Sequence, residues 1–194
     1  MTNPLDALNQ LSTAAREASQ ILGPSIDRAL SMVRDTIAKG GTLFFCGNGG
    51  SAADAQHLAT EYVVRYMRDR RPMRAIALTT DTSLLTAAAN DLGFEQVFAR
   101  QVEALARSGD LLIIHSTSGN SPNVLRAAEA ARQQKVATLA FSMGKGGALA
   151  GLVDHSVLVP TMRTDRAQEL HLCIQHAICD AIETSVAGQP GGDD

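Results

Sequence analysis

The first forty residues carry the apolar pattern of two amphipathic helices. In residues 5–22 the apolar positions recur at intervals of three and four, and the pattern stops at a Gly-Pro pair. A second helix is predicted over residues 25–39, with Ser25 as its N-cap and two glycines after its end. We therefore expect residues 1–40 to form an N-terminal helical extension.

A different pattern begins at residue 41, where short apolar runs alternate with longer helical segments. Each run is continuously apolar, which is typical of strands buried on both faces of a sheet. The runs occupy residues 42–46, 75–79, 110–115, 136–141 and 155–160, and the helical segments occupy residues 52–67, 82–106, 122–134 and 164–186. Strand–helix alternation of this kind predicts a doubly wound α/β fold, in which helices cover a five-stranded parallel sheet.

The length and composition are those of one folded domain. The chain has 194 residues, of which 45% are hydrophobic and 19% charged, so we interpret residues 1–194 as a single domain. Its α/β core is expected over residues 41–187. The last seven residues, "GQPGGDD" (188–194), are expected to form a disordered tail.

Charge and cysteine usage narrow the classes of partner and the compartment. The net charge is −3, and the one basic run (65–74) is interrupted by an aspartate and a proline, so we expect no nucleic-acid partner. No apolar stretch approaches the ~20 residues that cross a bilayer, and the first residues do not resemble a secretory signal. Three cysteines without a CxxC pair favour a reducing compartment, and we expect a cytoplasmic protein.

The loop after the first predicted strand, "GNGGSAAD", has the composition of an anion-binding turn. Asn48, Gly49 and Gly50 allow a tight turn, and Ser51 offers a hydroxyl at the positive end of the next helix. The loop matches neither the dinucleotide fingerprint nor a Walker loop, because the third glycine of the one and the lysine of the other are missing. A purely structural turn remains the alternative interpretation.

The loop after the third predicted strand, "STSGNSPNV", gathers four hydroxyls at another strand-to-helix turn. In a doubly wound sheet of order 2-1-3-4-5, the first and third strands flank the switch point where ligands bind. Hydroxyls and free N–H groups at a helix start suit the phosphate of a sugar phosphate. Ser121 with Pro122 after it also reads as an ordinary helix cap, but a cap does not account for the cluster at Ser116, Thr117 and Ser118.

Two histidine-bearing helices offer candidate chemistry. His57 and Glu61 are four residues apart and so share a helix face, which suits a metal site or an acid–base pair. A surface hydrogen bond between them is the alternative. On the last helix His171 is interpreted as a helix histidine bonded to a neighbour, and His115 and His155 as structural or solvent-facing. Cys46, Cys173 and Cys179 lie in apolar settings and are predicted to be core residues.

Together, "CGNGGSAADAQH", "STSGNSPNVLRAAEAA" and "RAQELHLCIQHAICDAIE" resemble the SIS (sugar isomerase) domain family and, within it, the phosphoheptose isomerases. The resemblance runs over nearly the whole chain. It implies a flavodoxin-like strand order and a homotetramer whose sites are built from adjacent subunits. It implies substrate contacts from residues of both loops and of several helices, namely Asn48, Gly49, Gly50, Ser51, Glu61, Arg65, Asn90, Asp91, Ser116, Thr117, Ser118, Ser121 and Gln168.

The resemblance also implies one zinc ion per subunit, with His57, Glu61, Gln168 and His176 as its ligands. Gln168 and His176 are eight residues apart, a rise of ~12 Å along a helix, so one metal reaches both only by lying midway. Glutamine is also an unusual zinc ligand. His57, Glu61 and His176 are therefore the firmer ligands of the set.

The reaction implied by the resemblance is the conversion of D-sedoheptulose 7-phosphate to D-glycero-D-manno-heptose 7-phosphate through an enediol. Glu61 is then the base and His176 the acid, with the product entering a lipopolysaccharide-core or other heptose-nucleotide pathway. A metal-bound Glu61 is a weaker base, so its two roles compete. The alternative is a catalytically silent SIS protein that binds a partner such as the replication initiator, in which the glutamate and the final histidine would be expected to be absent.

Overall fold

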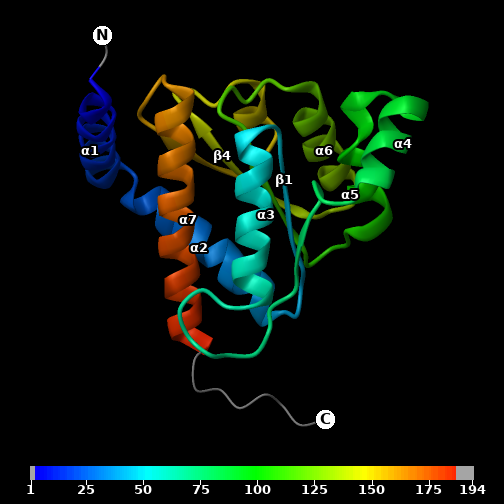
Figure 1. Cartoon of the computed structure of the whole chain (residues 1–194). Coiled ribbons are helices and arrows are strands. Elements are labelled where there is room, and N and C mark those ends of the chain that lie inside the picture. The colour runs from blue at the N-terminus through cyan, green and yellow to red at the C-terminus, as the bar shows by residue number, and fades with distance from the viewer. Residues whose placement is uncertain (1–2, 187–194) are drawn as a thin grey trace.

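The computed structural model describes residues 3–186 and contains the predicted parallel sheet (Figure 1). Its five strands follow the order β2-β1-β3-β4-β5, which confirms the expected doubly wound topology. The strands are β1 (Leu43–Gly47), β2 (Ala75–Ala77), β3 (Leu111–His115), β4 (Ala137–Met143) and β5 (His155–Val159).

Helices cover both faces of this sheet and complete a three-layer sandwich. One layer holds α1 (Pro4–Ile21), α2 (Gly23–Ala38), α3 (Gly50–Val63) and α7 (Thr164–Val186), and the other holds α4 (Thr82–Leu92), α5 (Ala99–Leu105) and α6 (Pro122–Gln133). Successive side chains of a strand point to opposite faces, so Phe45 and Ile113 enter the first core while Phe44 and Leu112 enter the second.

The edge strands depart from the prediction that every strand is buried on both faces. The inner strands β1 and β3 are buried throughout. In β2, by contrast, Ile76 is 42% exposed, and His155 at the start of β5 is half-buried. The prediction was wrong for these two strands because each lies at an edge of the sheet and has only one neighbouring strand.

The helix predicted over residues 82–106 is interrupted. It divides into α4, a 3-10 turn at Phe94–Gln96, and α5. The break falls at Gly93, whose φ of +94° lies in the region that glycine tolerates and a helix cannot contain. A short 3-10 helix at Ala148–Gly151 was not predicted at all.

The second helix begins earlier than predicted and is not capped by Ser25. It starts at Gly23, with Pro24 in the first turn, where the missing N–H of proline costs no hydrogen bond. The hydroxyl of Ser25 donates to the carbonyl of Ser156, and its oxygen lies 3.1 Å from Nε2 of His155. The serine therefore ties α2 to the edge strand β5.

The sheet brings the two polar loops together. The ends of β1 and β3 pair directly, with Gly47 opposite His115, so the loops that follow them leave the sheet side by side. Helices α3 and α7 lie next to each other on one face of the sheet (Figure 1). The predicted tail, residues 188–194, lies outside the described residues. Among the described helices none is long and apolar enough to span a bilayer.

Candidate active site

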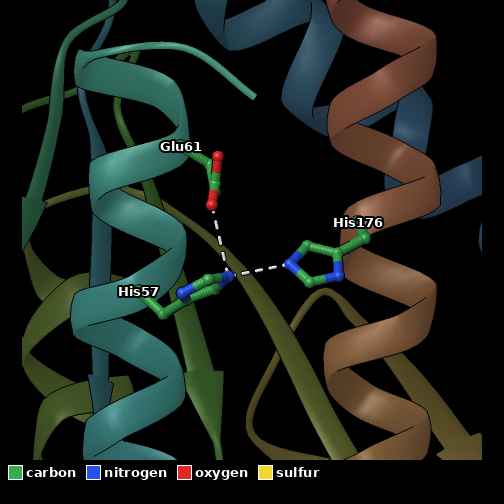
Figure 2. Close-up of side chains that lie close together, drawn as sticks. All are labelled: His57, Glu61 and His176. Atoms are coloured by element: carbon green, nitrogen blue, oxygen red, sulfur yellow. Dashed lines mark hydrogen bonds and ion pairs between the residues drawn. The ribbon is translucent and has the colours of Figure 1, made fainter. Parts of the chain in front are cut away.

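His57, Glu61 and His176 meet between α3 and α7 (Figure 2). Nε2 of His57 lies 3.3 Å from Oε1 of Glu61 and 2.8 Å from Nε2 of His176. The first two residues are one turn apart on α3, so the helix aims them at the same point. His176 approaches that point from α7. The three side chains that the sequence placed on two separate helices thus form one cluster.

The cluster lies at the edge of the core rather than inside it. The side chain of Glu61 is 16% exposed and that of His57 is 47% exposed. Partial burial lowers the pKa of His176, and the nearby imidazole of His57 lowers it further, while the carboxylate of Glu61 acts in the opposite direction. A neutral imidazole is the form that coordinates a metal or accepts a proton.

The donor set of the cluster fits a zinc ion. One ligand atom from each of the three residues can be chosen such that all lie within 4.8 Å of one another. Two imidazole nitrogens and one carboxylate oxygen are the protein ligands of one group of catalytic zinc sites. Among the described residues this is the only such group of histidine, cysteine and acidic side chains.

Gln168 belongs to α7, and its side-chain amide lies against Gly50, the first residue of α3. A Cβ atom on residue 50 would stand 2.6 Å from Nε2 of Gln168, so Gly50 leaves the space that the amide occupies. Gly50 precedes His57 by two turns of the helix. The amide is therefore well placed to contact a molecule bound at the loop, and its predicted role as a zinc ligand stays a prediction.

The glycine loop forms the tight turn that was predicted. Gly49 has a φ of +57° and is followed at once by the first turn of α3. The side-chain amide of Asn48 exchanges two 2.8 Å hydrogen bonds with that of Asn123, a buried residue in the first turn of α6. This pair joins the two polar loops. Ser51, in the first turn of α3, is only 3% exposed.

Two side chains of the serine loop (residues 116–121) accept hydrogen bonds from backbone N–H groups of the same loop. The hydroxyl of Ser116 accepts a hydrogen bond from the N–H of Gly119, and that of Ser118 accepts one from the N–H of Asn120. Ser121 stands at the N-cap position of α6, as predicted, but its side chain makes no capping hydrogen bond. Helix capping therefore does not account for the hydroxyl of Ser121. Thr117, in the same loop, is half-buried.

Three of the substrate-contacting residues implied by the resemblance belong neither to the two polar loops nor to the cluster of His57, Glu61 and His176. Arg65 is exposed and forms an ion pair with Asp69. Asn90 and Asp91 are in the last turns of α4, in the helical layer opposite α3, and Asn90 donates to Asp91 over 2.7 Å. Their contact with substrate remains a prediction.

The remaining histidines and cysteines divide between core and surface. His171 is buried and contacts the carbonyl of Ser142 at 3.0 Å, which confirms its structural interpretation. His115 is fully buried and hydrogen-bonded to Gln175. Cys173 is exposed, so its assignment to the core was wrong. It lies on the side of α7 that faces the surface near His176.

Sequence reasoning missed a buried ion pair next to the cluster. Arg70 and Glu183 have no exposed side-chain surface, and their Nε and Oε1 atoms lie 3.1 Å apart. Arg70 belongs to the basic run of residues 65–74, in which no feature of the sequence indicated a buried residue. The partners are 113 residues apart, and only the packing of α7 against the end of α3 brings them together.

The chain is similar in sequence to known sugar-phosphate isomerases. The model of the SIS domain family matches residues 7–142. A protein from Roseiflexus sp. (strain RS-1), named phosphoheptose isomerase, is 46% identical over 182 residues, which cover 94% of this chain and 92% of that protein. A second protein of that name, from Paramagnetospirillum magneticum, is 52% identical over 153 residues, which cover 79% and 80% of the two chains.

Solved structures extend the similarity to three dimensions. The phosphoheptose isomerase of Neisseria gonorrhoeae superposes with a TM-score of 0.88 at 42% identity, covering 93% of this chain and 96% of its own. That of Francisella tularensis gives a TM-score of 0.89 at 35% identity, with 94% and 100% covered.

Proposed function

The chain belongs to the SIS-domain sugar isomerases, among the phosphoheptose isomerases, and on that premise we propose that it converts D-sedoheptulose 7-phosphate to D-glycero-D-manno-heptose 7-phosphate. The observation that carries the proposal is the meeting of His57, Glu61 and His176 on helices that start from, or pass beside, the polar loops. An isomerase needs both features: groups that move a proton at one end of the sugar, and a hold on the phosphate at the other.

Glu61 and His176 are the proposed catalytic residues. Glu61 takes a proton from C1 of the ketose while His176 donates one to the oxygen at C2, and a cis-enediol forms. Glu61 then returns its proton to C2, and His176 accepts the proton from the oxygen at C1, which leaves the aldehyde. The partly buried carboxylate of Glu61 and the approach of His176 to the same point support these roles.

One zinc ion per subunit is proposed at the cluster, held by His57, Glu61 and His176, with Gln168 as the fourth ligand. When bound, zinc polarises the carbonyl group and orients the sugar. The donor atoms within 4.8 Å of one another support this site.

The two loops are the proposed binding site for the rest of the substrate. The phosphate is held by the hydroxyls and N–H groups of residues 116–121, and the sugar chain by Asn48, Gly49, Gly50 and Ser51. Binding energy from the phosphate then positions the reacting carbons. Arg65, Asn90 and Asp91 complete the site within a homotetramer, in which neighbouring subunits contribute to each site.

One assay tests the proposal. The protein is incubated with sedoheptulose 7-phosphate in deuterated water, with zinc or with a chelator, and aldose formation and deuterium at C2 are followed by NMR. We expect chelator-sensitive turnover, and a loss of about 10²–10⁴-fold in kcat for Glu61→Gln. A folded protein that binds the sugar phosphate but turns nothing over under any metal condition would favour the partner-binding alternative.

A further inference from the structure

The segment between α3 and β2 crosses to the far end of α7 and returns (Figure 1). One buried carboxylate holds it there. Glu183 of α7 accepts hydrogen bonds from the backbone N–H groups of Tyr66, Met67 and Arg68, at 2.7, 2.8 and 2.9 Å. Three consecutive N–H groups around one carboxylate form an anion nest, and they fix the backbone of the segment at residues 66–68.

Arg70 anchors the other side of the same segment. Its guanidinium pairs with Glu183 and donates to the carbonyls of Glu61 and Tyr62, at 2.5 and 2.8 Å. These carbonyls belong to the last turn of α3, which has no further helical N–H to satisfy them. The Arg70–Glu183 pair therefore closes the helix that carries Glu61 and holds the segment that follows it.

The position of Tyr66 is a consequence of this anchoring. Its ring stacks on the imidazole of His176, with the centroids 5.1 Å apart and the planes at 22°. The same imidazole also meets the ring of His57 edge-on, with the centroids 5.0 Å apart. A histidine on a helix surface has several rotamers, and the contacts with these two rings favour the one in which Nε2 of His176 faces His57.

We propose that Tyr66 is a positioning residue for His176, and that the Arg70–Glu183 pair holds Tyr66 in place. The inference rests on the proposed function, because a fixed His176 imidazole matters only if this residue binds the metal and transfers protons. A residue that orients a metal ligand from outside the coordination sphere commonly contributes 10–100-fold in metal affinity or activity. The aromatic ring of Tyr66 provides the contact that orients His176, and its hydroxyl group is not needed for it.

Three variants separate this role from a merely structural one. Tyr66→Leu removes the ring, and Tyr66→Phe keeps it. Arg68→Met removes an exposed ion pair with Asp180 from the same segment without touching the stack. For each variant, zinc affinity is measured by competition with a chromophoric chelator, and kcat and KM are measured with sedoheptulose 7-phosphate.

We expect Tyr66→Leu to lower zinc affinity and kcat by about 10-fold or more, with KM changed less than about twofold. Tyr66→Phe and Arg68→Met are expected to stay within about twofold of the parent. Glu183→Gln, where it folds, is expected to show the defect of Tyr66→Leu. A folded Tyr66→Leu protein with the zinc affinity and kcat of the parent would overturn the proposal, and so would an equal defect in Tyr66→Phe.

A further readout needs neither turnover nor metal. In the metal-free protein, 13C relaxation of the His176 ring reports how freely the imidazole moves. We expect greater ring mobility in Tyr66→Leu than in Tyr66→Phe. If the parent protein isomerises no sugar phosphate but this difference is present, the proposed function fails and the positioning role stands. If the parent isomerises and the two variants have equally rigid rings, only the positioning role fails.

Discussion

Glu183 keeps its carboxylate in a side chain with no exposed surface, between Arg70 and three backbone N–H groups. Burial alone would raise the pKa of Glu183, but the three N–H groups and the charge of Arg70 outweigh it and lower the pKa. Because the folded pKa lies below the unfolded one, the charged carboxylate stabilises the fold above about pH 4.3. This stability is lost as the pH falls through the folded pKa.

Replacing Glu183 by glutamine is therefore expected to destabilise the protein at neutral pH. Loss of one partner of a buried pair typically costs about 3–5 kcal/mol, because the other charge stays buried without compensation. Urea denaturation at pH 7 and at pH 3.5 measures the difference, which should shrink at the lower pH. Glu103→Gln is the matched control, since Glu103 pairs with Arg100 on the surface. Equal effects of the two substitutions would contradict the prediction.

Two buried histidines are expected to remain neutral in the folded protein. Burial lowers the pKa of His115 to about 3, with a contribution from nearby His171. Burial also lowers the pKa of His171 to about 4, although its bond to the Ser142 carbonyl opposes the shift. Since an unfolded histidine titrates near pH 6.5, both groups make stability fall as the pH drops below that value. An NMR titration should show both imidazoles uncharged at pH 5.5, and protonation of either at that pH would contradict the assignment.

Residues near in sequence could be assigned from the sequence, and distant pairs could not. His57 and Glu61 were predicted to share a face because helical spacing alone decides it. The contact between His57 and His176 spans 119 positions and was inferred only from the family resemblance. Nothing local indicates that Glu183 pairs with Arg70. Such a pairing depends on how α3 and α7 pack, which hydrophobic burial determines over the whole domain.

At the scale of elements, the interruption between α4 and α5 depends on the backbone conformation of Gly93, so substitution of this glycine should destabilise the protein. Gly93 combines a φ of +94° with a ψ of 149°, a region that side chains with a Cβ atom rarely adopt. Gly93→Ala is expected to lower the free energy of unfolding by about 1–3 kcal/mol. Gly151→Ala is the matched control, because its φ is not in that region and a Cβ there would have nothing within 4 Å. Thermal denaturation of both variants tests this, and a Gly93→Ala protein as stable as the parent would contradict it.

The sequence predicted the strands and their order better than it predicted where helices begin and break. Continuous apolar runs mark the inner strands β1 and β3, whose neighbours on both sides bury them. The same pattern does not distinguish an edge strand such as β2, because exposure depends on which strands are adjacent. A glycine inside a helical pattern costs only about 1 kcal/mol, so the break at Gly93 carries little local signal. The start of α2 at Gly23 was missed because a proline is compatible both with the end of a helix and with the first turn of the next one, and the sequence does not distinguish these two positions for Pro24.

At the scale of the whole molecule, the candidate zinc site joins two helices that are distant in the chain. His57 and Glu61 belong to α3 and His176 to α7, so bringing the ligands together requires both helices to be packed on the sheet. An unfolded chain does not assemble this site. A metal that binds only the folded form raises the free energy of unfolding, by about 2.7 kcal/mol when its concentration is 100 times Kd. For a domain of this size that corresponds to a rise in Tm of roughly 5–10 °C.

Calorimetric scans with zinc and with a chelator measure this stabilisation directly. We expect the rise in Tm in the parent protein and in Arg68→Met, whose substitution removes an exposed ion pair and none of the three ligands. Replacing His57 by asparagine removes one ligand from the more exposed side of the cluster, and its zinc-dependent rise should largely disappear. Magnesium, which prefers oxygen ligands, should produce no comparable shift. An equal rise in the His57 variant would mean that zinc stabilises the fold from another site. The proposal that the cluster between α3 and α7 binds the zinc would then be wrong.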